Sequence, residues 1–140
     1  MDERTPRVSV FLSFTSQGRV YARALAALLS SADMEAWFDE IVQPGESVEA
    51  ALRHALRSTS LVVVFVTPDA STSRWLNFEV GVATGRDVPV LPVLLDGVDA
   101  TFAASGVLGQ YQALDARNLS APLAAARIVE AVQHMGFGPK

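Results

Sequence analysis

The six residues Leu61–Val66, Leu-Val-Val-Val-Phe-Val, are apolar without interruption and rich in β-branched side chains. A strand with one face in water alternates apolar and polar residues, whereas a strand covered on both faces is apolar throughout. Val8–Phe14 has a similar composition, and Val88–Leu95 is a further apolar run. Strands of this kind belong to parallel sheets that are covered by helices.

The segments between these runs have helical spacing instead. After the loop Thr15–Gly18, apolar residues recur every three or four positions in Arg19–Ser30, at Val20, Ala24, Leu25, Leu28 and Leu29. A short strand is predicted at Glu35–Asp39 and a loop at Glu40–Glu46. Ser47 then caps a predicted helix whose apolar face consists of Val48, Ala51, Leu52, Ala55 and Leu56.

The second half of the chain continues the alternation. Leu61–Val66 leads through a turn to a helix that begins within Ser71–Glu79 and ends near Gly85, and Asp96-Gly97 closes the strand Val88–Leu95. Val98–Gln110 is mixed and predicts a short helix or an irregular segment. A fifth strand is predicted at Tyr111–Leu114. The last helix, Ser120–His134, has Pro122 in its first turn and an apolar face of Leu123, Ile128, Val129 and Val132.

Strands that alternate with helices at this spacing predict a parallel sheet with right-handed crossovers. We therefore expect one domain over residues 1–140, with a core from about residue 8 to residue 135. Five strands favour a flavodoxin-like three-layer α/β fold, with order 2-1-3-4-5 and helices on both faces. Ligands bind in this fold at the carboxyl ends of strands one and three, which here are Phe14–Arg19 and Thr67–Glu79.

Composition narrows the function classes. A net charge of -4 and a pI near 5.0 argue against nucleic acid as a partner, because phosphate backbones require clustered basic residues. The chain has no cysteine, and His54 and His134 are far apart, so no metal site is predicted. No segment has the length of a signal peptide or of a membrane span. We expect a cytoplasmic protein without a membrane partner.

Several familiar sites are missing from the sequence. It has neither a Gly-rich dinucleotide fingerprint after the first strand nor a phosphate-binding loop that ends in Lys-Ser or Lys-Thr. A response-regulator receiver needs an acidic pair and a phosphoacceptor Asp where this chain has Thr15-Ser16 and Thr67-Pro68. Ser13–Ser16 is a weak form of a flavin phosphate loop. No serine or threonine has a plausible histidine partner for nucleophilic catalysis.

The remaining candidate is the stretch Ser71–Glu79. Trp75 and Glu79 are four residues apart, so they share one face of the predicted helix. A lone carboxylate can stabilise an oxocarbenium-like transition state at a sugar carbon. No second acid is needed when the leaving group is already cationic, as nicotinamide is in NAD+. The alternative is that Glu79 is an exposed residue of an amphipathic helix and that Trp75 packs against its neighbours.

Four stretches resemble the boxes of Toll/interleukin-1 receptor (TIR) domains, in the right order. The first is Val10–Phe14, and the second is Trp37–Asp39 with Pro44-Gly45. The third joins Ser60–Pro68 to Ser73-Arg74-Trp75 and Glu79, and the fourth is Val90–Leu94. The resemblance runs from about Val8 to Gly97, and bacterial TIR domains are the most similar in style.

The resemblance implies cleavage of NAD+ into nicotinamide and ADP-ribose or a cyclic ADP-ribose, in bacterial antiphage defence. NAD+ is then the substrate, and no cofactor is expected. Carried over by position, Glu79 is the catalytic carboxylate. The substrate-binding positions are Phe14, Thr15, Arg19, Asp39, Pro44, Gly45, Ser73 and Trp75. Many catalytic members have a basic residue just after the first box, where this chain has Thr15–Gln17, so contacts to the phosphates must come from elsewhere. Arg19 and Arg74 are the candidates for these contacts.

The family resemblance also implies self-association through TIR–TIR contacts and an activator or sensor, separate or fused. A competing interpretation is a non-catalytic TIR–TIR interaction module in signalling or host interference, for which Glu79 would be replaceable. A third is a flavin- or nucleotide-binding protein of flavodoxin type. Whether the product is linear or cyclic depends on whether water or a substrate nitrogen reaches the same cation.

Overall fold

The computed structural model describes residues 8–38, 59–68, 87–98 and 112–137. In these ranges the chain forms β1 (Ser9–Ser13), η1 (Ser16–Gly18), α1 (Arg19–Ser31), β2 (Glu35–Phe38), β3 (Leu61–Val66), β4 (Val90–Leu94), β5 (Leu114–Asp115) and α5 (Ala121–His134). The five strands pair in parallel in the order β2-β1-β3-β4-β5, which confirms the predicted fold class and strand order.

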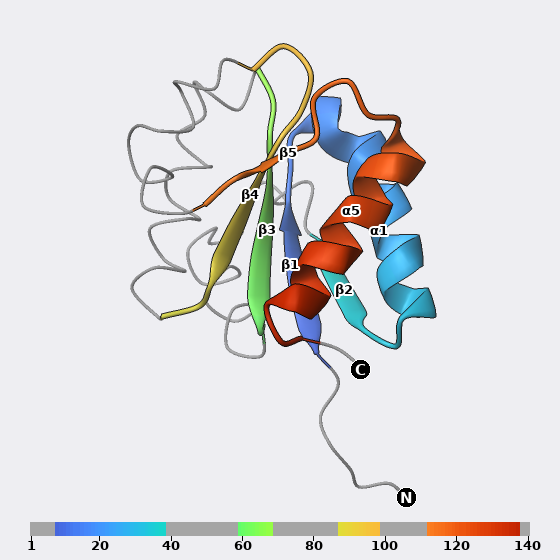
Figure 1. Cartoon of the computed structure of the whole chain (residues 1–140), viewed down its shortest axis with the longest axis vertical. Coiled ribbons are helices and arrows are strands. Elements are labelled where there is room, and N and C mark those ends of the chain that lie inside the picture. Colours follow the sequence, from blue (N-terminus) through green and yellow to red (C-terminus); the bar gives the residue numbers. More distant parts are fainter. Residues whose placement is uncertain (1–7, 39–58, 69–86, 99–111, 138–140) are drawn as a thin grey trace, which may run out of the picture.

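Helices α1 and α5 lie side by side on one face of the sheet (Figure 1). The core under them contains alternate residues of the central strands, because successive side chains of a strand point to opposite faces. These residues include Val10 and Leu12 of β1, Leu61, Val63 and Phe65 of β3, and Val93 of β4. The alternate set on the other face, including Phe11, Val62 and Val64, is buried too. Burial on both faces is what the unbroken apolar runs predicted.

The inward faces of the two helices differ in part from the predicted ones. Leu25 and Leu29 of α1 are buried as expected, but the third buried residue is Ala22. Val20 is 66% exposed and Leu28 is 37% exposed, although both belong to the apolar spacing that predicted the helix. The reason is geometric, because residues 22, 25 and 29 form one stripe at helical spacing and residues 20 and 28 lie beside it.

Helix α5 shows the same pattern. Ile128 and Val132 are buried as predicted, whereas Leu123 is 58% exposed. Ala124 and Ala125 take the remaining buried positions. Alanines as well as larger apolar residues are therefore buried on both helices, which contact each other. In the described ranges, none of the helices has both the length and the apolar character that are needed to span a membrane.

The two ends of α5 are set by local sequence. Ser120 is the N-cap, and its Oγ accepts a hydrogen bond of 3.4 Å from the backbone N–H of Leu123, with Pro122 in the first turn as predicted. At the other end Gly136 has a φ of +96°. Its N–H donates to the carbonyl of Gln133 and the N–H of Phe137 donates to that of Val132, which is a Schellman motif.

The edge strand β5 lies further along the chain than predicted. Leu114 and Asp115 pair with Val93 and Leu94, whereas residues 112 and 113 lie outside the strand and Tyr111 lies outside the described residues. The prediction followed the apolar and aromatic character of 111–114. The register is instead decided at the far end, where the N–H of Ala116 donates to the carbonyl of Leu94 at 2.9 Å.

Candidate functional site

The carboxyl ends of β1 and β3 are neighbours in the sheet, as the strand order requires. Thr15 follows β1, Thr67 follows β3, and their Oγ1 atoms lie 3.1 Å apart in a hydrogen bond. Thr67 is only 2% exposed. The point at which the strand order reverses is where this architecture binds ligands, and in the described part of the chain a pair of hydroxyls lies there.

Phe14 belongs to the hydrophobic core at this end of β1 and is 8% exposed. A Cβ added to Gly18 would lie 3.3 Å from the Cβ atoms of both Phe14 and Phe65. The absence of a side chain at residue 18 therefore lets the start of α1 pack directly on the ends of β1 and β3.

The structure brings three of the predicted site residues to one end of the sheet. Phe14 and Thr15 follow one another after β1, and Arg19 is the first residue of α1, with a partly buried side chain. The other predicted positions lie outside the described residues. These are Asp39, Pro44, Gly45, Ser73, Trp75 and Glu79.

A cavity of about 350 Å³ opens at this same edge of the sheet. We name it the carboxyl-edge pocket. In the described part of the chain it is lined by residues from η1, α1 and the ends of β3 and β4: Gln17, Tyr21, Thr67, Pro68, Leu95 and Asp96. Thr67 therefore belongs both to the hydroxyl pair and to the pocket wall, and connects the two features.

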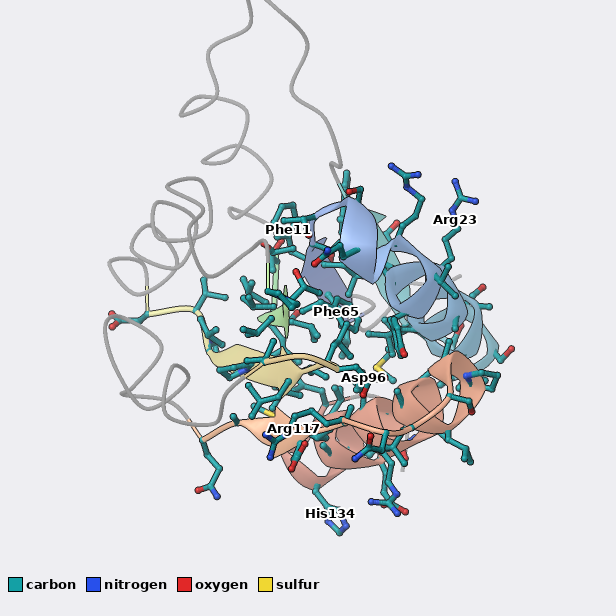
Figure 2. The ribbon with its side chains drawn as sticks, turned by 90° about the horizontal axis from the view of Figure 1, so that it is seen from above. Phe11, Arg23, Phe65, Asp96, Arg117 and His134 are labelled. Atoms are coloured by element: carbon teal, nitrogen blue, oxygen red, sulfur yellow. The ribbon has the colours of Figure 1, made fainter. Side chains whose placement is uncertain are left out.

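Hydrogen bonds join the loop that follows β4 to the loop that follows β5, beside this pocket. The backbone N–H of Asn118 donates to Oδ1 of Asp96, and Nη1 of Arg117 donates to the carbonyl of Val98 at 3.2 Å. Figure 2, seen from the end where the strands finish, shows Asp96 and Arg117 close together there, with His134 pointing away on the outer side of α5. These contacts fix the position of the Asp96 carboxylate.

Arg117 also makes an ion pair with Asp115, with 2.8 Å between Nη2 and Oδ2. Hydrogen bonds from the guanidinium and from the backbone N–H of Arg117, together with its charge, lower the pKa of Asp115 from 3.8 to about 2. The guanidinium is thus occupied by Asp115 and by a backbone carbonyl.

The family model for the TIR domain matches residues 10–129, which is most of the chain. The protein belongs to the TIR domain family. No curated protein sequence matches it.

Solved structures with the same fold include other TIR domains. Those of the activated Roq1 resistosome, which directly recognises the pathogen effector XopQ, superpose with a TM-score of 0.69 at 17% identity, covering 89% of this chain and 99% of theirs. The TIR domain of the Toll-related receptor TRR-2 from Hydra magnipapillata gives 0.63 at 15% identity, with coverage of 91% and 92%. A diflavin flavoprotein A3 from Nostoc sp. gives 0.59 at 12% identity, with coverage of 94% and 96%. At these identities the similarity concerns the fold.

This TIR domain has a second hollow at the opposite end of β4 and β5, which we name the apolar pocket. Its volume is about 520 Å³, and its described lining consists of Pro89, Val90, Leu91, Gln112, Ala113, Leu114, Ala131 and Met135. None of these residues carries a titratable side chain. A group for proton transfer or charge stabilisation is absent from this described lining, so the carboxyl edge is the better candidate site.

Sequence reasoning missed part of the carboxyl edge. Gln17, Tyr21, Thr67 and Asp96 were not chosen as site residues, although each lines the pocket. For Thr67 and Asp96 a signal existed, because each is one of the first polar residues after an apolar strand. No such signal marked Tyr21, because an aromatic residue in an amphipathic helix is usually part of the core. Within the described ranges, no three His, Cys, Asp or Glu residues gather into a possible metal site.

Proposed function

We propose that this TIR domain is an NAD+ glycohydrolase that uses Glu79 as its catalytic carboxylate. The observation that carries the proposal is membership of the family over residues 10–129, a range that includes Glu79. The resemblance of Ser73-Arg74-Trp75 and Glu79 to the family motif assigns the chemistry to this segment. It follows β3, and hence the Thr15–Thr67 pair, by a few residues.

The chemistry requires little beyond one carboxylate. As the bond between the nicotinamide nitrogen and the ribose carbon breaks, its electron pair leaves with nicotinamide, which becomes neutral. The positive charge moves to the ribose, where an ionised Glu79 stabilises it. Water then adds and loses a proton to give ADP-ribose, or a substrate nitrogen adds to give a cyclic product. No general acid is needed for the leaving group.

The hydroxyl pair at the ends of β1 and β3 supports this proposal. Thr15 and Thr67 place hydroxyl groups, and no charge, at the ends of β1 and β3. Such groups donate hydrogen bonds to a polar substrate without competing with Glu79 for the developing cation. Arg19 begins α1 four residues after Thr15, so among the described cations it is well placed in sequence for the substrate phosphates. Arg74, which lies outside the described residues, is the other candidate from the sequence.

Release of nicotinamide from NAD+ by the purified chain, measured by chromatography over a series of protein concentrations, tests the proposal. Glu79→Gln removes the charge and keeps the shape, so we expect a loss of at least about a hundredfold in rate. Glu130→Gln is the matched control, because Glu130 is an exposed residue of α5 and the charge change is the same. Undiminished NAD+ loss in the Glu79 variant contradicts the assignment.

We further propose that the domain acts after self-association, as an effector of bacterial antiphage defence with a separate or fused activator. Val20, Ala24 and Leu28 lie four residues apart on one side of α1, and Val20 and Leu28 are exposed. Exposed apolar side chains of this kind favour a contact with another protein surface. The neighbouring Roq1 structure is also a set of TIR domains, in a resistosome.

The same α1 surface supports a second candidate function, a TIR–TIR interaction module without catalysis. The two candidates make opposite predictions about concentration and Glu79. For the enzyme, nicotinamide release per molecule rises with protein concentration and depends on Glu79. For the module, light scattering shows association with no nicotinamide release, and Glu79→Gln changes neither.

A further inference from the structure

The carboxyl-edge pocket combines one carboxylate with apolar walls. Leu95 is buried and Pro68 is exposed at the end of β3, while Asp96 presents its carboxylate at the surface. A volume of about 350 Å³ lies within the range of roughly 300–1,000 Å³ that is usual for small-molecule sites. The proposed catalysis gives no role to Tyr21 or Asp96 of this pocket.

The carboxylate of Asp96 is suited to hydroxyl donors. An ionised carboxylate only accepts hydrogen bonds, and its two oxygens offer about four lone-pair sites. The Asn118 N–H uses one of these sites on Oδ1, which orients the group, and Asp96 lines the pocket. Adjacent hydroxyls of a ribose match two such oxygens, and an acidic residue holds ribose in this way in other dinucleotide-binding sheets.

An anionic ligand does not fit the described lining. No Lys or Arg lines the pocket within the described residues, so a phosphate would meet Asp96 without a compensating cation. Arg117, which lies close by, already contacts the Asp115 carboxylate and the Val98 carbonyl. The pocket is therefore suited to a neutral ligand that carries hydroxyl groups.

Tyr21 supplies a rigid aromatic wall. Its hydroxyl donates a hydrogen bond of 3.4 Å to the carbonyl of Leu119, which ties α1 to the loop before α5 and limits rotation of the ring. Nucleobases stack on aromatic faces with little dependence on their identity. The amide of Gln17 at the same pocket can both donate to and accept from the edge of a base.

We propose that the carboxyl-edge pocket binds a neutral nucleoside, with its ribose diol on Asp96 and its base against Tyr21. The chemistry fits adenosine, either free or as the end of NAD+ that is not cleaved. The second identification rests on the proposed NAD+ glycohydrolase function. Thr67 lines the pocket and contacts Thr15, so a dinucleotide bound at the strand ends would extend from the hydroxyl pair into the pocket.

The test is calorimetric titration of the full chain with adenosine and with 2′,3′-dideoxyadenosine. Removing the diol removes hydrogen bonds to a charged group, so the dideoxy compound should bind at least about tenfold more weakly. Asp96→Asn should weaken adenosine binding by a similar factor. Its amide oxygen still accepts the Asn118 N–H, so the loop keeps its anchor. Glu130→Gln, an equal change of charge on α5, should bind like the wild type.

Two variants of Tyr21 test its ring separately from its hydrogen bond to Leu119. Tyr21→Phe keeps the ring and loses the bond to Leu119, so adenosine binding should remain within about twofold, whereas Tyr21→Ala should lose about tenfold or more. Circular dichroism of both variants controls for folding. If Asp96→Asn binds adenosine as tightly as the wild type, the ribose assignment is wrong.

The outcomes also separate this inference from the proposed function. Adenosine binding that depends on Asp96, together with loss of NAD+ that is the same in the wild type and in Glu79→Gln, keeps the nucleoside pocket and contradicts the enzyme. Release of nicotinamide that depends on Glu79, without adenosine binding or any rise in the KM for NAD+ in Asp96→Asn, keeps the enzyme and overturns the pocket. A yellow preparation whose flavin is not displaced by adenosine also overturns it.

Discussion

The two ends of the β4–β5 pair differ in chemistry although the same two strands form both. At the amino ends, the apolar pocket is lined by residues such as Val90, Leu114 and Met135. At the carboxyl ends, Asp96 and Arg117 hold neighbouring loops together beside the carboxyl-edge pocket. In a parallel sheet all strands end on the same side, and ligands in open α/β sheets bind outside these carboxyl ends. The larger hollow is therefore the less suitable one for chemistry.

The largest effect is expected on the free energy of unfolding, when a glycine near each end of the β4–β5 pair is replaced by alanine. Gly97 has a φ of +86°, and an added Cβ would lie 2.9 Å from Cγ of Pro68 in the carboxyl-edge pocket. Gly136 has a φ of +96° beside Met135 of the apolar pocket, and nothing lies within 4 Å of its Cβ position. Gly97→Ala should lower the free energy of unfolding by about 2–4 kcal/mol, and Gly136→Ala by about 1 kcal/mol.

Urea denaturation of both variants measures this difference. Because both residues have positive φ, the backbone cost is shared, and the excess in Gly97→Ala isolates the collision with Pro68. Equal losses for the two variants would show that the loop after β4 moves freely away from Pro68, and the contrast between a fixed and an open end would be lost.

A smaller effect should come from filling the apolar pocket. Ala131 lines this pocket on α5 and is partly buried. Ala131→Leu adds apolar surface that the hollow can accept, so the free energy of unfolding should rise by about 0.5–1 kcal/mol. Adenosine binding at the other end should not change. Thermal denaturation and calorimetry check the two statements, and a change in adenosine affinity would show that the ends are coupled.

The smallest effect concerns pH at the carboxyl edge. Arg117 lowers the folded-state pKa of Asp115 to about 2, below the ordinary value of 3.8. The carboxylate therefore stabilises the fold above about pH 4, and this contribution is lost as the pH falls from 3.8 toward 2. In Arg117→Gln the pKa of Asp115 should return toward 3.8, which NMR titration of the side-chain carbonyl measures. An unchanged pKa of Asp115 would show that Arg117 does not form this ion pair in solution.

Much of the fold followed from local patterns. The run Leu61–Val66 was predicted with its observed ends, and α1 and α5 were placed to within one residue, because continuous apolar runs and helical spacing report burial directly. The position of β5 was missed, since two residues are too few to carry a pattern and their register depends on Leu94. Thr15 was chosen for the site, whereas its partner Thr67 was not.

The sequence by itself determined the parallel sheet, because strands that alternate with helices require parallel crossovers. It also indicated the strand order, through the flavodoxin-like arrangement that five such strands favour, and the carboxyl end as the place of a site stays a prediction. The tertiary structure decided which side chains meet there. The hydroxyl pair of Thr15 and Thr67, and the pocket that Tyr21 and Asp96 both line, bring together residues more than fifty positions apart. The tertiary structure also leaves the side chains of Val20 and Leu28 exposed to solvent. A local pattern encodes how deeply a residue is buried but not what it is buried against, because that depends on how distant segments pack.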